Sequence, residues 1–201
     1  MPGSSGPKRP VRAFLAVLLV AVLGALAWTT YRTSRDAPPR REVLNPAGTR
    51  GRALVAYHPG LSDFQARVSR AFATGLAHAG WQVELVTATR SAPTDLSAYD
   101  LLAFGAPTYW WAPARPLQRY LGRLDLGGKP TVLLLTGAGA TSRSLRILEG
   151  LIRGRHGTLA GAHVYFTMAP NREADYSWRT NKDVGVALAE SAGLALPPPR
   201  P

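Results

Sequence analysis

The chain has 201 residues, a formal net charge of +12 and no cysteine. The lack of cysteine excludes disulfides, thiolate catalysis and cysteine-ligated zinc or iron–sulfur centres. Hydrophobic residues make up 46% of the chain and charged residues 18%, which favours a packed core over wholesale disorder. The length fits one domain of ordinary size with an extension.

The excess positive charge lies mainly ahead of the expected domain. Up to Arg52, nine Lys or Arg residues face Asp36 and Glu42, a net of +7, whereas residues 53–196 hold fourteen basic and ten acidic residues, a net of +4. Basic residues that flank an apolar segment are typical of a membrane-inserted helix. We therefore expect anionic membrane lipid, and no nucleic acid, as the partner of this charge.

The apolar segment follows residues 1–12, a basic region rich in Pro and Gly that we expect to be disordered. Residues 13–31 carry no charge and span roughly 28 Å as a helix, enough to cross the hydrocarbon core of a bilayer. The length favours an uncleaved transmembrane anchor. The alternative is a signal peptide, because Ala25-Leu26-Ala27 matches a cleavage pattern, and the domain would then be exported. A buried core helix is disfavoured, since the flanks are basic and one-sided periodicity is lacking.

The segments around the domain have distinct compositions. Residues 32–51 mix Pro, Arg, Gly and Asn without periodicity, and we expect a linker there. Residues 52–195 are expected to form the domain, and residues 196–201 a Pro-rich tail that is neither helix nor paired strand. Basic residues lie on both sides of the apolar segment, so the positive-inside rule does not decide which side of the membrane holds the domain.

Short apolar runs alternate with amphipathic patterns through the domain. The first helical pattern starts with Ser62 and Gln65 at capping-box spacing and ends at Gly80. The alternation of strand and helix predicts a doubly wound α/β domain with a five-stranded parallel sheet. We expect strands at residues 53–57, 81–86, 100–104, 131–135 and 163–168, and helices at residues 62–80, 117–124, 145–152 and 182–192.

Two loops that follow buried strands carry the residues most suited to a ligand. Residues 100–117, DLLAFGAPTYWWAPARPL, place three consecutive aromatics, Tyr109 to Trp111, after the third strand. Ligands bind beyond the carboxyl ends of strands in open α/β sheets, and flat aromatic side chains suit a flat conjugated ligand. A covered core edge is the alternative role for these aromatics. After the fourth strand, residues 136–142 form a loop of small residues that lets the backbone approach a ligand closely.

Arginines follow the aromatic loop at four-residue spacing, at positions Arg115, Arg119 and Arg123. Such a stripe is typical of a solvated helix face, and a docking surface is the alternative. His78 and His156 have no partner nearby in the sequence. We therefore expect no catalytic residue and no metal ligand.

The run from Tyr99 to Gly139 resembles the flavodoxin family. Flavodoxin-like proteins have a closely similar run, with G-[ST]-P-[TV]-Y-W after the third strand and D-L-x-G-K-P/V ahead of the fourth. The resemblance covers nearly all of residues 53–195 and implies a flavodoxin-like domain of the short-chain type, with sheet order 2-1-3-4-5 and FMN at the carboxyl edge. The residues that it implies as lining the flavin are Pro107, Thr108, Tyr109 and Trp110 in the aromatic loop and Thr136, Gly137, Ala138 and Gly139 in the small-residue loop.

The loop after the first strand differs from the S/T-x-T-G-N-T pattern with which flavodoxins hold the FMN phosphate. In residues 58–64, Ser62 supplies the one hydroxyl, Pro59 has no N–H and Asp63 brings negative charge. Ser62 is therefore expected as a phosphate contact, as an N-cap or as both. His58 is expected as a turn residue or as a phosphate contact, and Arg67 as a further source of positive charge.

Two functions stay open for such a domain. The first is a membrane-tethered, FMN-binding redox protein that exchanges electrons with a redox partner protein or a small-molecule acceptor, for example from NAD(P)H to a quinone-like compound. The second is a flavodoxin-fold module that has lost FMN and serves as a binding or structural protein at the membrane. The aromatic and small-residue loops favour the first function, and the unusual first loop favours the second.

Overall fold

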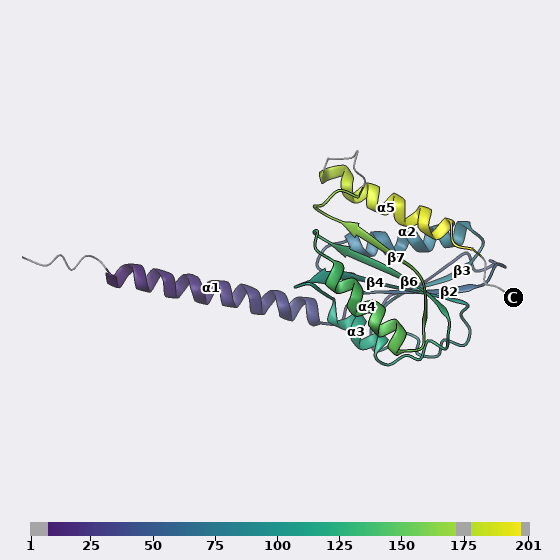
Figure 1. Ribbon diagram of the computed structural model, residues 1–201, viewed down its shortest axis with the longest axis horizontal. Helices are drawn as coiled ribbons and strands as arrows, with labels where there is room; N and C mark the ends of the chain where they lie inside the picture. The colour runs from purple at the N-terminus through teal and green to yellow at the C-terminus, as the bar shows by residue number, and fades with distance from the viewer. Residues whose placement is uncertain (1–7, 172–177, 198–201) are drawn as a thin grey trace, which may run out of the picture.

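The computed structural model describes residues 8–171 and 178–197, so most of the expected n-region and of the Pro-rich tail lies outside the described residues. A long helix, α1 (Lys8–Ser34), projects from an α/β domain (Figure 1). α1 begins inside the segment that was expected to be disordered. Pro10 does not prevent this, because it lies in the first helical turn, where a missing N–H costs no hydrogen bond.

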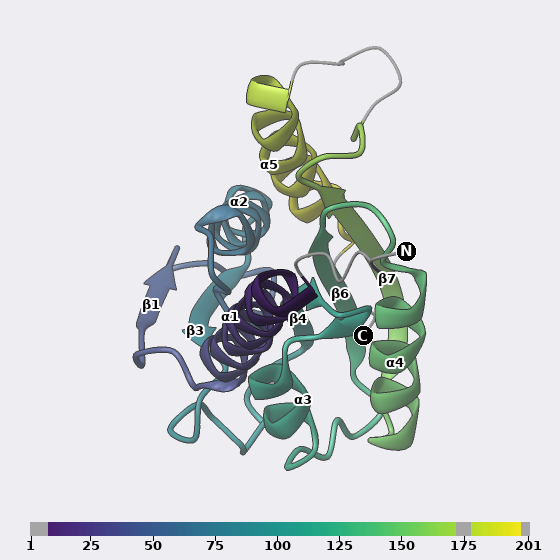
Figure 2. The same cartoon turned by 90° about the vertical axis from the view of Figure 1, so that its left-hand side faces the viewer.

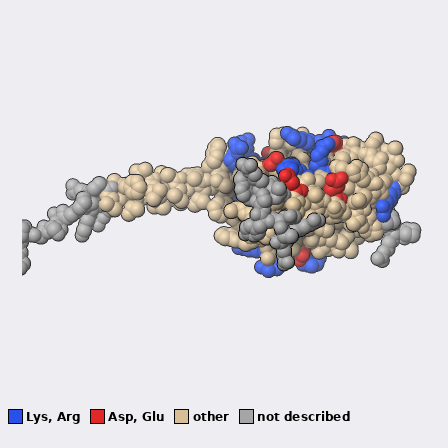
Figure 3. Space-filling model, turned by 90° about the horizontal axis from the view of Figure 1, so that it is seen from above, with Lys and Arg blue, Asp and Glu red and all other residues tan. Residues whose placement is uncertain are grey.

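α1 is apolar along most of its length and is joined to the domain at its end. Ala13–Ser34 is long and apolar enough to cross a membrane, with a mean hydropathy of 2.3 over a window that is not buried in the protein. Figure 3 shows the middle of this helix without acidic or basic side chains, and Arg32 lies in its last turn. In the last turn Thr33 is buried, and Arg119 of α3 (Arg115–Leu121) donates hydrogen bonds to Ser34 O (2.9 Å) and Asp36 Oδ1 (2.6 Å).

The centre of the sheet consists of parallel strands, namely β2 (Arg52–Tyr57), β3 (Gln82–Thr87), β4 (Leu101–Tyr109), β6 (Pro130–Gly137) and β7 (Thr158–Phe166). The order along the sheet is β1-β3-β2-β4-β6-β7, and β5 pairs with β4. The expectation of five strands is wrong, because the sheet has seven. It is also mixed, since β1 (Arg41–Leu44) and β5 (Ala112–Pro113) run antiparallel to their partners.

Four strands differ from the sequence-based expectation. β4 continues to Tyr109, beyond the expected end at residue 104, and β5 follows it where only a loop was expected. β1 lies in the segment expected to be a linker, where Arg41 forms an ion pair with the buried Glu84 of β3 (Nε to Oε1, 2.9 Å). A four-residue strand with two charges carries too little pattern to be recognised. β7 runs from Thr158 to Phe166, whereas the expected strand covered residues 163–168. The expectation missed its first half because residues 160–162, Ala-Gly-Ala, have low strand propensity.

Helices cover both faces of the sheet (Figure 2). α2 (Phe64–His78) and α5 (Trp178–Leu194) pack on one face, and α3 and α4 (Ser142–Gly154) pack on the other. Each face has its own hydrophobic cluster. Phe72 of α2 is fully buried in the cluster beneath α2 and α5, whereas Leu117 and Leu148 belong to the cluster beneath α3 and α4. The cover on both faces explains why the central strands are continuous apolar runs.

The capping box expected at the start of α2 is wrong. The N-cap residue is Asp63, whose side chain makes no capping hydrogen bond. Gln65 is buried instead, and its amide donates to Ser69 Oγ (3.0 Å) and Leu134 O (3.3 Å). Its Oε1 accepts a hydrogen bond from the Thr136 hydroxyl (2.8 Å). The spacing alone cannot distinguish a glutamine that caps its helix from one that turns toward the sheet.

Candidate functional site

Three loops meet at the carboxyl edge of the sheet. Tyr57 at the end of β2 pairs with Gly105 of β4, and Pro107 of β4 pairs with Thr136 of β6. The loops after these strands are therefore neighbours, in the arrangement that doubly wound sheets use for ligands. They are named here the first loop (residues 58–63), the tryptophan turn (residues 110–111) and the small-residue loop (residues 136–142).

The tryptophan turn joins β4 to β5 with two residues. Tyr109 pairs with Ala112, so Trp110 and Trp111 form the turn, and both have positive φ angles, +51° and +58°. Hairpin turns of this kind favour Asn-Gly, because a β-carbon in the left-handed region costs roughly 1–2 kcal/mol per residue. The two residues are 53% and 57% exposed. The turn thus holds two large apolar side chains outward on a strained backbone.

Tyr109 connects the tryptophan turn to the first loop. Its hydroxyl accepts a hydrogen bond from the Leu61 N–H (2.7 Å), its ring packs against the hydrophobic core, and burial raises its pKa. Gly60, with a φ of +82°, is needed at this contact, because a β-carbon there would lie 2.7 Å from the Tyr109 hydroxyl. Of the three consecutive aromatics, the two tryptophans therefore offer exposed rings and Tyr109 holds the loops together.

The small-residue loop is partly engaged within the protein. Thr136 is buried, and its hydroxyl is bound to Gln65 of α2. The carbonyls of Gly137 and Ala138 accept hydrogen bonds from backbone N–H groups of the segment after β7, each 2.9 Å long. At Gly139, in contrast, no atom lies within 4 Å of the position that a β-carbon would take. Ala138 is itself exposed, so the accessible backbone of this loop lies at Ala138 and Gly139, apart from the bound Ala138 carbonyl.

The remaining residues implied by the resemblance lie at the end of β4. Pro107 is buried, whereas Thr108 is half-buried. The Thr108 hydroxyl oxygen is itself buried and has no hydrogen-bond partner among the described residues. A β-carbon at Gly137 would lie 3.6 Å from this oxygen. Thr108 thus places an unsatisfied hydroxyl between the tryptophan turn and the small-residue loop.

A pocket of about 510 Å³, named here the cationic pocket, lies between the first loop and the end of α1. Its lining residues are Arg32, Arg35, Asp36, Ala37 and Pro38 on the α1 side and His58, Pro59, Gly60 and Leu61 on the loop side. The guanidinium groups of Arg32 and Arg35 lie over the rings of Trp28 and Tyr31, 5.8 and 5.1 Å from the ring centroids. Sequence reasoning missed these arginines as site residues, because their basic character was visible but their place beside the first loop depends on the fold.

The polar residues of the first loop differ in their surroundings. His58 is 4% exposed, and its Nδ1 has no hydrogen-bond partner among the described residues. Burial lowers the pKa of His58 to about 4, while Asp36 acts in the opposite direction, so the imidazole is neutral at pH 7. Ser62 is exposed just ahead of α2. Arg67 forms an ion pair with Asp183 of α5, so the positive charge that was expected to serve this loop is paired elsewhere.

The carboxyl edge therefore combines exposed indole rings, accessible backbone and a cationic pocket. These features suit a flat, conjugated ligand that carries an anionic group. Within the described residues, no group of three or more His, Asp or Glu side chains is placed to hold a metal ion. His78 and His156 contact Glu190 and Asp125, partners that are distant in the sequence.

No protein-family model and no curated protein matches the chain. A flavodoxin from the domain Archaea is 17% identical, with a TM-score of 0.51 over 70% of this chain and 98% of its own. An NAD(P)H:quinone oxidoreductase from Methanothermobacter marburgensis is 17% identical, with a TM-score of 0.53 over 73% and 99%. A flavodoxin from Streptococcus pneumoniae TIGR4 is 13% identical, with a TM-score of 0.54 over 72% and 99%. At these identities the likeness establishes the fold, which is flavodoxin-like.

Proposed function

We propose that this chain is a membrane-tethered redox protein that binds FMN at the carboxyl edge of its flavodoxin-like domain. The observation that carries the proposal is the meeting of the tryptophan turn, the small-residue loop and the cationic pocket at that edge. A bound flavin supplies the electron-transfer chemistry, while the protein positions it and sets its surroundings. Solved structures described as flavodoxins and as an NAD(P)H:quinone oxidoreductase share the fold, which supports a redox role.

The flavin ring would lie between the tryptophan turn and the small-residue loop. Trp110 and Trp111 would stack on it, and the accessible backbone at Ala138 and Gly139 would meet its polar edge. The unsatisfied Thr108 hydroxyl would line the same site. Electrons would pass from NAD(P)H or a redox partner protein to a quinone-like acceptor.

The phosphate would lie at the first loop, with cations that come from α1. The N-terminus of α2 turns its unpaired N–H groups and the positive end of its dipole toward this position. Ser62 adds one hydroxyl, and Arg32 and Arg35 line the adjoining pocket. These two guanidinium groups would offset the charge of Asp63, whereas the neutral His58 would contribute a hydrogen bond.

The tether would be α1. Trp28 and Tyr31 near its end, with Arg32 and Arg35 over their rings, form the aromatic and basic pattern that is typical of a membrane–water interface. A signal sequence shares the length and composition of this helix. Carbonate extraction of cell membranes separates the two, because an anchored chain stays in the membrane fraction at its uncleaved mass.

The proposal is tested by titrating FMN into the full-length chain in lipid nanodiscs. We expect saturable quenching of flavin fluorescence and an affinity lower by about tenfold in Trp110→Ala, because stacking on the indole is lost. Leu194→Ala removes a similarly exposed apolar side chain at the end of α5 and is expected to bind like the wild type. A folded chain that shows no saturable binding at high micromolar FMN would contradict the proposal.

The same titration with riboflavin, which lacks the phosphate, tests the two arginines. Arg32→Ala/Arg35→Ala is expected to weaken FMN binding by about tenfold and to leave riboflavin binding unchanged, because charge-assisted hydrogen bonds to the phosphate are lost. Arg153→Ala/Arg155→Ala removes the same charge at the end of α4 and serves as the control. An equal loss for both flavins would place the effect outside the phosphate.

A second function, a flavodoxin-fold module that works at the membrane without FMN, is favoured by two contacts. The Leu61 N–H is bound to the Tyr109 hydroxyl, and the Thr136 hydroxyl is bound to Gln65. Two polar groups of the expected flavin site are therefore already satisfied within the protein. Retention in the membrane without FMN binding is the result expected for this function.

A further inference from the structure

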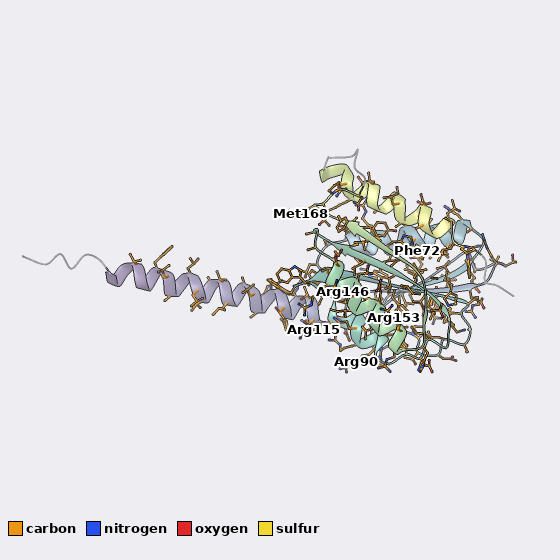
Figure 4. All side chains as sticks on the ribbon, viewed as in Figure 1. Phe72, Arg90, Arg115, Arg146, Arg153 and Met168 are labelled. Carbon is orange, nitrogen blue, oxygen red and sulfur yellow. The ribbon has the colours of Figure 1, made fainter. Side chains whose placement is uncertain are left out.

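The domain exposes few large apolar side chains in its described part, and most of them lie at one edge. Beyond α1 the exposed large hydrophobic residues are Val43, Leu61, Trp110, Trp111, Met168 and Leu194. Leu61 belongs to the first loop and Met168 follows β7, so four of these six stand at the carboxyl edge of the sheet. Figure 4 shows Met168 on the side of the domain nearest to α1.

α1 leaves the domain from this same edge, the one toward which the parallel strands point (Figure 1). Six residues separate the end of α1 from the start of β1. Arg119 donates hydrogen bonds to both Ser34 and Asp36. The last turn of α1 and the first loop also lie close together, because both line the cationic pocket. If α1 crosses a bilayer, the carboxyl edge is therefore held close to the lipid surface.

We infer that the carboxyl edge of the sheet docks on the bilayer that α1 spans, with Trp110 and Trp111 in the headgroup region. The inference rests on the proposed membrane tether and does not depend on flavin binding. Tryptophan suits this position, because its apolar ring and polar N–H match the membrane–water interface. Arg115 and Arg146 lie on the same side of the domain (Figure 4), where they complement anionic headgroups.

The strained backbone of the tryptophan turn supports this role. Trp110 and Trp111 adopt the left-handed conformation that Asn-Gly would adopt at lower cost. Both indoles remain more than half exposed in the domain, so their burial contributes little to its folding. Transfer of the indoles from water into the interface offsets the strain, which accounts for large apolar residues at positions that disfavour them.

Docking in this orientation determines which acceptor can reach the candidate flavin site. The tryptophan turn and the first loop border that site, and both carry apolar side chains of the docked edge. In the docked chain this border of the site therefore faces lipid. The acceptor that fits this geometry is an apolar, lipid-soluble compound that arrives through the bilayer.

The test uses the full-length chain without flavin, in nanodiscs of phosphatidylcholine and phosphatidylglycerol whose upper acyl chains carry bromine, a quencher of indole fluorescence. Trp28→Phe removes the indole of α1, and Trp28→Phe/Trp110→Phe/Trp111→Phe also removes those of the turn. The difference in fluorescence between these variants reports the tryptophan turn alone. We expect brominated lipid to lower this difference by about threefold or more, and aqueous acrylamide to have little effect.

Two controls separate the possible outcomes. Leu194→Trp adds an indole at the far end of α5, and its added fluorescence is expected not to respond to bromine. The difference in fluorescence between the wild type and Trp28→Phe reports Trp28 alone, and hence the insertion of α1. A quenched Trp28 with a turn that responds to acrylamide and not to bromine would overturn the docking and leave the tether intact; the edge would then face a partner in water. If neither responds to bromine, both the tether and the docking fail.

Discussion

Among single residues, His58 is expected to make the stability of the domain sensitive to acid. Burial lowers its pKa from 6.5 to about 4, so the folded state binds the proton more weakly than the unfolded state. Between these pH values the unfolded chain takes up more protons, and stability falls as the pH falls through this window. The loss approaches about 3 kcal/mol at most. Urea unfolding in detergent at pH 7 and at pH 4.5 measures it.

His58→Gln is the matched variant for this prediction. Glutamine keeps a polar side chain of similar length but does not titrate, so the difference in stability between the two pH values is expected to shrink. A loss as large in His58→Gln as in the wild type would assign the acid sensitivity to other groups. Anion binding in the cationic pocket is expected not to change with this titration near pH 7, because His58 is neutral there.

The residue types of the candidate site could be read from the sequence, but their contacts could not. Pro107 to Trp110 and Thr136 to Gly139 lie at the carboxyl edge, where the resemblance to flavodoxins implied them. The inward turn of Thr136 toward Gln65 joins residues 71 positions apart, which no local pattern reports. Arg32 and Arg35 were recognised as a basic flank, whereas their position beside the first loop is a property of the folded chain.

Among the elements, the tryptophan turn is expected to sacrifice stability for function. Trp110→Asn/Trp111→Gly gives the turn the sequence that two positive φ angles favour, and we expect the free energy of unfolding to rise by about 1–3 kcal/mol. The same variant is expected to lose flavin quenching and lipid contact, because both indoles are gone. Thermal unfolding in detergent measures the gain.

Trp110→Ala/Trp111→Ala is the control for this turn. It also removes both indoles, but it keeps a β-carbon at each position with positive φ, so no comparable gain in stability is expected. Equal stability of the Ala-Ala and Asn-Gly variants would show that backbone strain is not the reason for the gain. Comparison of their lipid contact then isolates the role of the rings from that of the backbone.

The central strands were predictable because they are buried on both faces. β2, β3 and β6 lie close to the expected positions, since helices on either side demand continuous apolar runs. β4 starts as expected but continues to Tyr109, through residues that were expected to form a loop. The strands that sequence reasoning missed or misplaced are β1, β5 and β7. β1 and β5 are too short to show a period, and β7 alternates between exposed and half-buried positions in a run of small residues. Their strand conformation comes from pairing with a neighbour rather than from their own sequence.

For the whole molecule, the direction of α1 relative to the domain depends on a small set of contacts. Arg119 supplies two of them, to Ser34 O and to Asp36. Arg119→Ala is expected to let the domain tilt away from the bilayer, so that quenching of the tryptophan turn by brominated lipid falls by about twofold. Quenching of Trp28 is expected to stay the same, because insertion of α1 does not depend on this contact.

Arg123→Ala is the matched control, because it removes the same charge from the stripe of arginines that follows the tryptophan turn. Its hydrogen bonds go to Thr89 O and Arg90 O within the domain, not to α1. If Arg119→Ala and Arg123→Ala dock equally well, the apolar edge alone orients the domain and the junction adds nothing. If Arg119→Ala also lowers the preference for FMN over riboflavin, the junction both orients the domain and brings Arg32 and Arg35 to the phosphate, because one displaced helix end would then account for both losses.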